Sequence, residues 1–241
     1  MQFIRKHLFA YITTVTAVTF AALFCANLYA SATAVSAAAE ALRTTIVIDA
    51  GHGGEDGGAV SPDGVRESAL NLEIAMRLND MLHLIGCETQ MIRTADVSIH
   101  SSDAGSISEK KISDLKNRVQ IVNAAGEALL VSIHQNMFQE AKYDGMQVFY
   151  AQTGGSKMLA ESVQALVSAA LDPGNRRAAK PAESVYLMNE IRCTGILVEC
   201  GFLSNPAECR KLQTPEYQKQ IVLVLADGLQ DYLRKVHTNE V

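Results

Sequence analysis

The sequence predicts an α/β protein, a three-layer α/β/α domain with a mostly parallel central sheet, preceded by an N-terminal hydrophobic export segment. Apolar, β-branched runs typical of buried strands alternate along the chain with stretches in which apolar residues recur every three or four positions, as in amphipathic helices. The 241 residues are 48% hydrophobic and 20% charged, which suits a globular protein with one sizeable core. Such alternation is typical of a sheet covered by helices on both faces.

Residues 1–30 predict the export segment. Arg5 and Lys6 precede residues 8–30, which contain no Asp, Glu, Lys or Arg. A run of this length can span a bilayer, whereas the small residues that follow it also offer signal-peptide cleavage sites. A cleaved signal peptide and a retained membrane anchor are therefore both open. Either one places the rest of the chain outside the cytoplasm. Residues 31–43 are expected to be a linker.

The charge of the exported part argues against a nucleic-acid partner. Without Arg5 and Lys6 the chain has 19 basic and 26 acidic residues, a net charge of −7. It contains no basic stripe of the kind that binds phosphate backbones. A membrane contact is expected only through the export segment, if that segment is retained.

The cysteines outside the export segment predict buried free thiols. They show neither a C-x-x-C pair nor zinc-finger spacing, although a single disulfide is the alternative. These residues are Cys87, Cys193, Cys200 and Cys209.

The first half of the domain begins with a strand over about Thr45–Asp49. A glycine-rich turn carrying His52 follows it. We expect a helix from Ser68, with Ser68 as N-cap, which ends at Gly86. A strand over about Glu88–Ile92 and a polar surface loop from Thr94 to Ser108 come next.

The middle of the domain predicts a helix over about Ile112–Ala125 and then a buried strand over Ala128–Ile133 that ends at His134. A strand over Met146–Tyr150 and an amphipathic helix from Gly155 follow. The Pro- and Gly-rich segment from Asp172 to Lys180 predicts a loop.

The last third predicts a short strand over Ser184–Met188 and a strand over Gly195–Val198 that contains a continuous apolar run. Asn205 begins a short helix. The final helix has Thr214 as cap, with proline at its first position, and extends to about Arg234.

The glycine-rich turn does not fit a dinucleotide site. The pattern G-x-G-x-x-G would need glycine at the sixth position, but counting from Gly51 that position is Asp56. No acidic residue closes the second strand, where Arg93 and Thr94 stand instead of a ribose partner.

Two histidines and a carboxylate suit a metal site. His52 and His134 follow strands, and Glu67 lies at the start of a helix. A lone strand-end histidine is more often a structural residue, but the carboxyl ends of parallel strands share one edge of a sheet. Two histidines and one carboxylate leave the fourth position of a tetrahedral zinc ion open. Asp49 and Asp56 are candidates to orient the His52 ring.

Glu199 is the candidate base. It follows the buried run Ile196–Val198, where an unpaired charge is costly, so it is expected to be catalytic or else paired with Arg192 or Arg93. A nucleophilic Cys200 with His134 as base is disfavoured, because no helix N-terminus is at hand to lower the pKa of the thiol.

Four segments carry a resemblance to a known family: VIDAGHGGEDGGA, RESALNLEIA, LLVSIHQN and LVECGFLSNPAE. In content and order they are similar to the motifs of the zinc-dependent N-acetylmuramoyl-L-alanine amidases, over about Thr44–Leu233. The segments SDLKNRVQIVN and SVYLMNEI further resemble the germination-specific spore-cortex members. The resemblance implies a catalytic domain over residues 44–236.

The resemblance implies one zinc ion per chain, held by His52, Glu67 and His134, with Glu199 as catalytic acid/base. Asn136 matches the asparagine that follows the second histidine. We expect Asn136, like Asp49, to bind substrate or to support the ligands. Gln135 and Cys200 depart from the family pattern, which leaves the fine shape of the pocket open.

The implied reaction is hydrolysis of the amide between N-acetylmuramic acid and L-alanine in peptidoglycan. The spore-cortex resemblance implies that cleavage prepares muramic-δ-lactam, which germination requires. Alternatives are a general autolysin of the same chemistry, a zinc peptidoglycan peptidase or deacetylase, and a non-catalytic wall-binding regulator. Whether an accessory protein must stabilise metal binding is open, and the sequence does not identify one.

Overall fold

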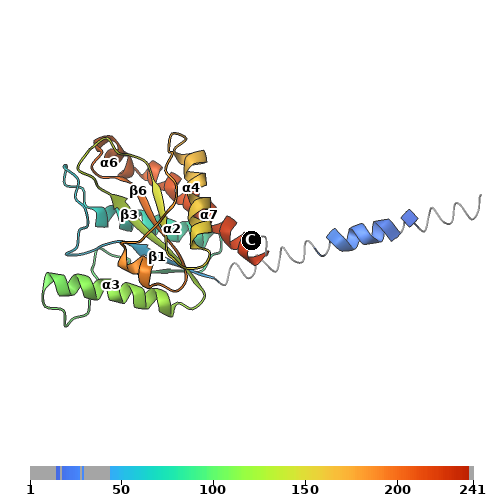
Figure 1. Ribbon diagram of the computed structural model, residues 1–241, viewed down its shortest axis with the longest axis horizontal. Helices are drawn as coiled ribbons and strands as arrows, with labels where there is room; N and C mark the ends of the chain where they lie inside the picture. Colours follow the sequence, from blue (N-terminus) through green and yellow to red (C-terminus); the bar gives the residue numbers. More distant parts are fainter. Residues whose placement is uncertain (1–14, 17, 28, 30–43, 239–241) are drawn as a thin grey trace, which may run out of the picture.

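A six-stranded sheet forms the centre of the computed structural model, which describes residues 15–16, 18–27, 29 and 44–238 (Figure 1). The strand order is β2-β1-β3-β6-β4-β5. The first four strands in this order are mutually parallel, β4 is antiparallel to β6, and β5 is parallel to β4. The prediction of a mostly parallel sheet is therefore confirmed. The strands are β1 (Thr45–Ala50), β2 (Thr89–Met91), β3 (Ala128–Asn136), β4 (Gln147–Tyr150), β5 (Lys180–Pro181) and β6 (Thr194–Phe202).

Helices cover both faces of the sheet, as predicted. One face packs against α2, α4, α6 and α7, and the other against α3 and α5 (Figure 1). The alternation of β1 shows why: Ile46 and Ile48 belong to the first core, whereas Val47 belongs to the second. The helices are α2 (Glu67–Leu84), α3 (Ile107–Ala124), α4 (Ser156–Leu166), the π-helix η1 (Val167–Leu171), α5 (Tyr186–Glu190), α6 (Pro206–Leu212) and α7 (Pro215–His237).

The N-cap of α2 lies two residues before the predicted position. Arg66 is the N-cap, so Ser68 does not cap the helix but lies buried in its first turn. Glu67 is the first helical residue, where the partial positive charge of the helix N-terminus favours a carboxylate. Gly86 has a φ of +85° and follows the end of the helix, as expected for a residue that stops it.

Helix α3 begins five residues before the predicted position, inside the segment predicted to be loop. Ser106 and Glu109 form a capping box, in which each side chain accepts a hydrogen bond from the backbone N–H of the other. This S-x-x-E pattern is visible in the sequence and marks the true start of the helix.

The segment Ser184–Met188 is not a strand, and that prediction was wrong. Tyr186–Glu190 is the short helix α5, which packs Leu187 and Met188 into the second core. Burial of these apolar side chains against α3 overrides the β propensity of the local sequence. The caps of the last two helices are as predicted: Asn205 and Thr214 each accept hydrogen bonds from backbone N–H groups, and each precedes a proline.

The predicted export segment and linker lie largely outside the described residues. The described residues between 15 and 29 are helical, and within the described parts of the chain no helix is both long and apolar enough to cross a membrane. All five cysteines are described, and none forms a disulfide. Cys200 and Cys209 are buried as expected, whereas Cys87 and Cys193 are partly exposed.

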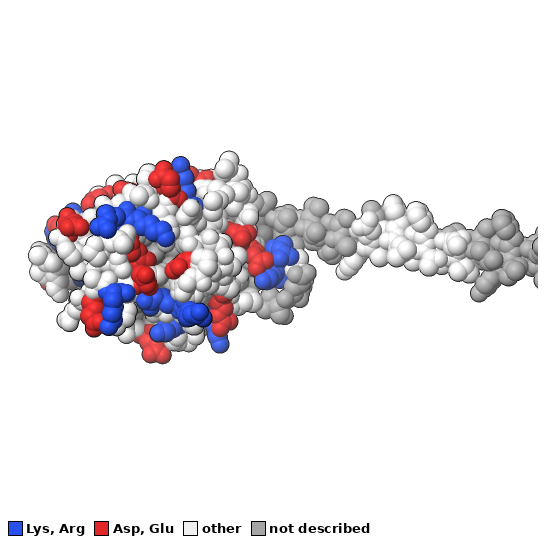
Figure 2. Space-filling view, turned by 90° about the horizontal axis from the view of Figure 1, so that it is seen from above, with Lys and Arg blue, Asp and Glu red and all other residues white. Residues whose placement is uncertain are grey.

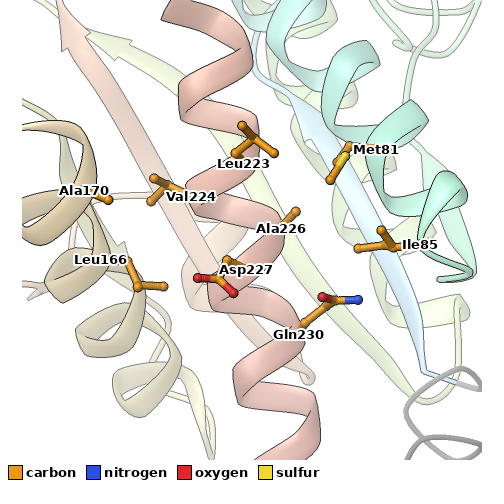
Figure 3. Close-up of a pocket in the computed structure, with 9 residues that line it drawn as sticks. All are labelled: Met81, Ile85, Leu166, Ala170, Leu223, Val224, Ala226, Asp227 and Gln230. Carbon is orange, nitrogen blue, oxygen red and sulfur yellow. The ribbon is translucent and has the colours of Figure 1, made fainter.

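The surface offers no single-sign charge stripe on the face shown in Figure 2, where acidic and basic side chains are interspersed. A hollow of about 400 Å³ lies between α2, α4 and α7 (Figure 3). Its apolar lining includes Met81 and Ile85, at the opposite end of α2 from Glu67, and Leu223 of α7.

Candidate metal centre

The turn after β1 holds His52 in an unusual backbone conformation. Its φ is +61°, and within the described part of the chain it is the sole residue other than glycine with a positive φ. The left-handed region costs a side-chain-bearing residue on the order of 1–3 kcal/mol, and such strain persists only where surrounding contacts impose it. The contacts that impose it here come from two buried arginines.

Arg118 of α3 fixes the turn from one side. Its guanidinium donates to the carbonyl oxygens of Ala50 at 3.0 Å and His52 at 2.8 Å. It is held by Asp114 at 2.5 Å and by a shorter ion pair with Asp49. Burial disfavours the charged guanidinium, but the two carboxylates outweigh burial and raise the pKa of Arg118 above its usual range.

Arg93 fixes the turn from the other side. It donates to the carbonyls of Ala50 at 2.8 Å, Gly51 at 3.1 Å and Ser68 at 2.8 Å, and so ties the turn to the start of α2. Arg93 is therefore committed to the backbone and does not pair with Glu199. We did not identify either arginine as a turn support from the sequence, because an arginine on an amphipathic helix or after a strand normally predicts a surface position.

Removing the Arg118 charge is expected to destabilise the protein by about 3–5 kcal/mol, because Asp49 and Asp114 would remain buried without their partner. Arg118→Met keeps the volume of the side chain and should lower the midpoint of urea unfolding. Lys157→Met, which breaks an exposed pair with Glu161, serves as control and should change stability by less than about 1 kcal/mol. Equal stability of the two variants would contradict this role of Arg118.

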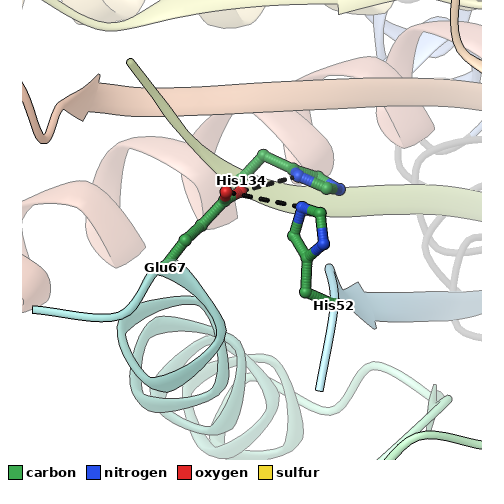
Figure 4. A group of neighbouring side chains, drawn as sticks. All are labelled: His52, Glu67 and His134. Carbon is green, nitrogen blue, oxygen red and sulfur yellow. Dashed lines mark hydrogen bonds and ion pairs between the residues drawn. The ribbon is translucent and has the colours of Figure 1, made fainter. Parts of the chain in front are cut away.

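Three side chains meet at the carboxyl edge of the sheet: His52 from the turn, Glu67 from α2 and His134 from β3 (Figure 4). His134 Nδ1 lies 2.9 Å from Glu67 Oε1, and His52 Nε2 lies 3.4 Å from Glu67 Oε2. The rings of the two histidines are nearly perpendicular, with centroids 5.1 Å apart. All three donor atoms lie within 4.8 Å of one another. The structure therefore brings together the three ligands expected from the sequence.

Glycines make room for these ligands. A Cβ on Gly51 would lie 2.2 Å from His134 Cε1. One on Gly58, whose φ is +66°, would lie 2.6 Å from Glu67 Oε2. At these two positions the sequence requires glycine because the side chains of the candidate metal ligands occupy the space.

Asp56, rather than Asp49, contacts the His52 ring. Its Oδ2 lies 2.8 Å from His52 Nδ1, which leaves Nε2 facing Glu67. Burial disfavours the charged imidazole, but Glu67 and then Asp56 outweigh it and raise the pKa of His52 to about 8. Asp49 is 1% exposed and forms an ion pair with Arg118, which in turn donates to the carbonyl of His52.

Several donors orient the Glu67 carboxylate. Oε2 accepts from the backbone N–H of Ala59 at 2.8 Å, and Oε1 accepts from the backbone N–H of Gln135 at 3.1 Å and from the amide of Asn71 at 3.3 Å. Burial alone would raise the pKa of Glu67, but the two histidines reverse this and hold it far below the usual range. The carboxylate is therefore ionised, as a metal ligand must be.

Glu199 lies directly beside His134, because the two residues are paired in the register of β6 and β3. Its Oε2 is buried and has no hydrogen-bond partner among the residues that the structure describes. Burial raises the pKa of Glu199 to about 7, with His134 opposing and Glu67 adding to the shift. Neither Arg192 nor Arg93 supplies the partner that a purely structural carboxylate would need.

The two remaining residues of interest flank this group. Asn136 is the last residue of β3, and its carbonyl accepts from the backbone N–H of Leu203 where the register with β6 shifts. Cys200 is fully buried on β6, and burial raises the pKa of its thiol well above the ordinary value. A nucleophilic thiolate at Cys200 is therefore ruled out by its surroundings.

The donor set fits a borderline metal ion such as zinc. Two imidazole nitrogens and one carboxylate oxygen converge from three elements, and a carboxylate oxygen without a hydrogen-bond partner among the described residues, Glu199 Oε2, lies next to them. Three protein ligands leave a coordination position for water or substrate, which is the arrangement of catalytic rather than structural zinc sites.

Comparison with known proteins gives the same family. The sequence model described as N-acetylmuramoyl-L-alanine amidase matches residues 46–231. The germination-specific N-acetylmuramoyl-L-alanine amidase of Bacillus subtilis is 34% identical over 188 residues, which are 78% of this chain and 78% of that protein. The amidase LytC of the same organism is 30% identical over 79% of this chain, but over only 36% of its own length.

A solved structure shares both fold and sequence. The CwlD amidase from Clostridioides difficile, solved in complex with the GerS lipoprotein, superposes with a TM-score of 0.77 at 35% identity. The match covers 79% of this chain and 98% of that one. Fold, motif order and these relatives agree, and the chain belongs to the N-acetylmuramoyl-L-alanine amidase family, enzymes that hydrolyse peptidoglycan.

Proposed function

We propose that His52, Glu67 and His134 hold one zinc ion per chain, and that Glu199 is the catalytic acid/base of amide hydrolysis. The observation that carries this proposal is the convergence of three metal donors within 4.8 Å beside Glu199, whose buried Oε2 has no hydrogen-bond partner among the described residues. Burying an unpaired carboxylate oxygen is costly, so a catalytic role accounts for its presence better than a structural one.

Bound zinc supplies Lewis-acid polarisation of the amide carbonyl and lowers the pKa of its water toward roughly 7. Glu199 then moves the protons: it accepts one from the attacking water and delivers one to the amine of the departing L-alanine. In the metal-free protein burial raises the pKa of Glu199 to about 7, and a carboxyl group in such a buried position can both accept and release a proton.

The metal is expected to bind more tightly as pH rises toward 8. In the metal-free protein His52 is protonated below its pKa of about 8, and only neutral imidazole binds metal. Zinc affinity measured by chelator competition should therefore fall about tenfold for each pH unit below 8. Conversely, the stability that protonated His52 gives the metal-free protein is fully present below pH 6.5 and is lost as pH rises through 8. Affinity independent of pH between 6.5 and 8.5 would contradict this account.

The proposed organisation is a signal peptide or anchor over residues 1–30, a linker over residues 31–43 and a catalytic domain over residues 44–236. The family match over residues 46–231 supports the last of these. We place the catalytic domain outside the cytoplasm, facing the cell wall or spore cortex. The neighbour solved in complex with a lipoprotein supports the proposal that an extracytoplasmic accessory protein also acts with this chain.

The proposed substrate is spore-cortex peptidoglycan, in which cleavage prepares the muramic acid for δ-lactam formation. One relative supports it: it is named as germination-specific, and it matches this chain over similar shares of both proteins. LytC supports the second candidate, a general wall amidase, but this chain spans about a third of its length.

Cortex composition separates the two candidates. Spores of a strain that lacks this protein should contain little or no muramic-δ-lactam, and mass spectrometry of digested cortex should show intact stem peptides instead. Restoring the wild-type gene should restore the lactam, whereas a Glu199→Gln gene should not. Normal δ-lactam in the deletion strain would favour the general wall amidase.

A further inference from the structure

Two buried side-chain amides, Asn71 and Gln135, stand behind the Glu67 carboxylate. Asn71 lies one helical turn after Glu67 and is fully buried, and Gln135 follows His134 on β3 with 3% of its surface exposed. Asn71 Nδ2 donates to Glu67 Oε1 at 3.3 Å and to the carbonyl of Gly51 at 3.2 Å. Gln135 Nε2 donates to Asn71 Oδ1 at 3.1 Å.

The orientation of both amides follows from their neighbours. A backbone carbonyl and an ionised carboxylate only accept hydrogen bonds, so the NH2 group of Asn71 must face Gly51 and Glu67. Its Oδ1 then faces Gln135, which must present its own NH2 group. Turning the Asn71 amide by half a turn would place an oxygen against the Glu67 carboxylate, and the hydrogen bond from Gln135 opposes that rotation.

The Gln135 amide is retained although half of it is unsatisfied. Its Oε1 is buried and, within the described part of the chain, has no hydrogen-bond partner. Leaving such an acceptor unpaired costs about 1–3 kcal/mol, and an apolar side chain of the same length would avoid that cost. The Gln135 side chain interacts with the Cys200 thiol and with Asn71, and its backbone N–H donates to Glu67 Oε1. The bond to Asn71 is the side-chain contact that leads to the Glu67 carboxylate, so the role of the amide is to be sought there.

We propose that Gln135 is a positioning residue for the metal centre, which locks the Asn71 amide so that Asn71 donates to Glu67 and holds its carboxylate in one orientation. The inference rests on the proposed role of Glu67 as a metal ligand. It predicts that Gln135 affects metal binding although it does not touch the metal. Groups that orient metal ligands typically change affinity by 10–100-fold when they are removed.

The first test is zinc affinity of the full chain, measured by chelator competition. Gln135→Met keeps the length of the side chain and removes the donor, and it should weaken zinc binding about tenfold. Gln135→Leu gives a second variant should the first fail to fold. Gln164→Met is the matched control. Gln164 on α4 is similarly buried, and its side-chain amide bonds to the backbone of Val148 in β4 and of Met146, the residue before β4. This control variant should leave zinc affinity unchanged.

A double variant tests whether Gln135 acts through Asn71. In an Asn71→Ala background, Gln135→Met should have no further effect on zinc affinity. A tenfold loss in that background too, or wild-type affinity in Gln135→Met alone, would overturn the proposal.

A metal-free measurement keeps the inference separate from the proposed function. In wild-type protein without zinc, the two hydrogens on Asn71 Nδ2 should exchange slowly with solvent in NMR spectra, and Gln135→Met should speed their exchange at least tenfold. Fast exchange in the wild type would contradict the proposed role of Gln135 in holding the Asn71 amide, even if zinc binds. Failure of the wild type to bind zinc, with Asn71 still protected, would count against the zinc proposal alone.

Discussion

Replacing Glu199 with Gln is expected to lower kcat by about 10²–10⁴-fold while zinc content stays at one ion per chain. The amide has the shape of the carboxyl group but cannot accept a proton from water at neutral pH. Glu199 is not among the three converging metal donors, and its Oε2 has no other partner to lose. Release of peptide from purified peptidoglycan and metal analysis of the same sample would give both quantities.

Glu190→Gln is the control for this variant, because Glu190 is an exposed carboxylate at the end of α5. It should keep activity within about twofold, as surface substitutions usually change little. Near-normal turnover by Glu199→Gln would refute the assignment of Glu199 as acid/base and would leave the role of its buried carboxylate unexplained.

Replacing His134 with Ala is expected to abolish both zinc binding and turnover. Two protein ligands would remain, and catalytic zinc sites ordinarily use three. The loss should appear as zinc content far below one per chain after dialysis, and added zinc should not restore activity at micromolar concentration.

His83→Ala controls for loss of a histidine as such. His83 is exposed on α2 and bonds to Thr89 rather than to the metal group. The variant should bind zinc like the wild type. If His134→Ala retained a full equivalent of zinc, the set of ligands proposed here would be wrong.

The parts of the fold that the sequence predicted are those set by local patterns. The strand before His52, the buried run before Glu199 and the caps at Asn205 and Thr214 all depend on neighbours within a few residues. The convergence of His52 and His134 followed from one further rule, that parallel strands end at the same edge of a sheet.

The parts that could not be predicted depend on distant contacts. Arg118 meets Asp49 across 69 positions of sequence, and no local pattern distinguishes it from a surface arginine on α3. Its partner explains why Asp49 does not orient the His52 ring, a task that falls to Asp56. The antiparallel direction of β4 likewise depends on its pairing with β6.

The glycines of the first turn make room for neighbouring side chains. At Gly51 and Gly58 that room is filled by His134, His52 and Glu67 themselves. Substitution at either glycine would therefore displace a ligand before it could affect substrate.

The central claim, a zinc amidase built on His52, Glu67, His134 and Glu199, is tested most directly by one coupled measurement. Wild-type protein is analysed for metal, and peptidoglycan digested with the same sample is analysed by mass spectrometry. The account predicts one zinc per chain and release of stem peptides that begin with a free L-alanine amine, with the glycan strands left intact. Metal-free protein that still releases these peptides, or zinc-loaded protein that cleaves a different bond, would contradict it.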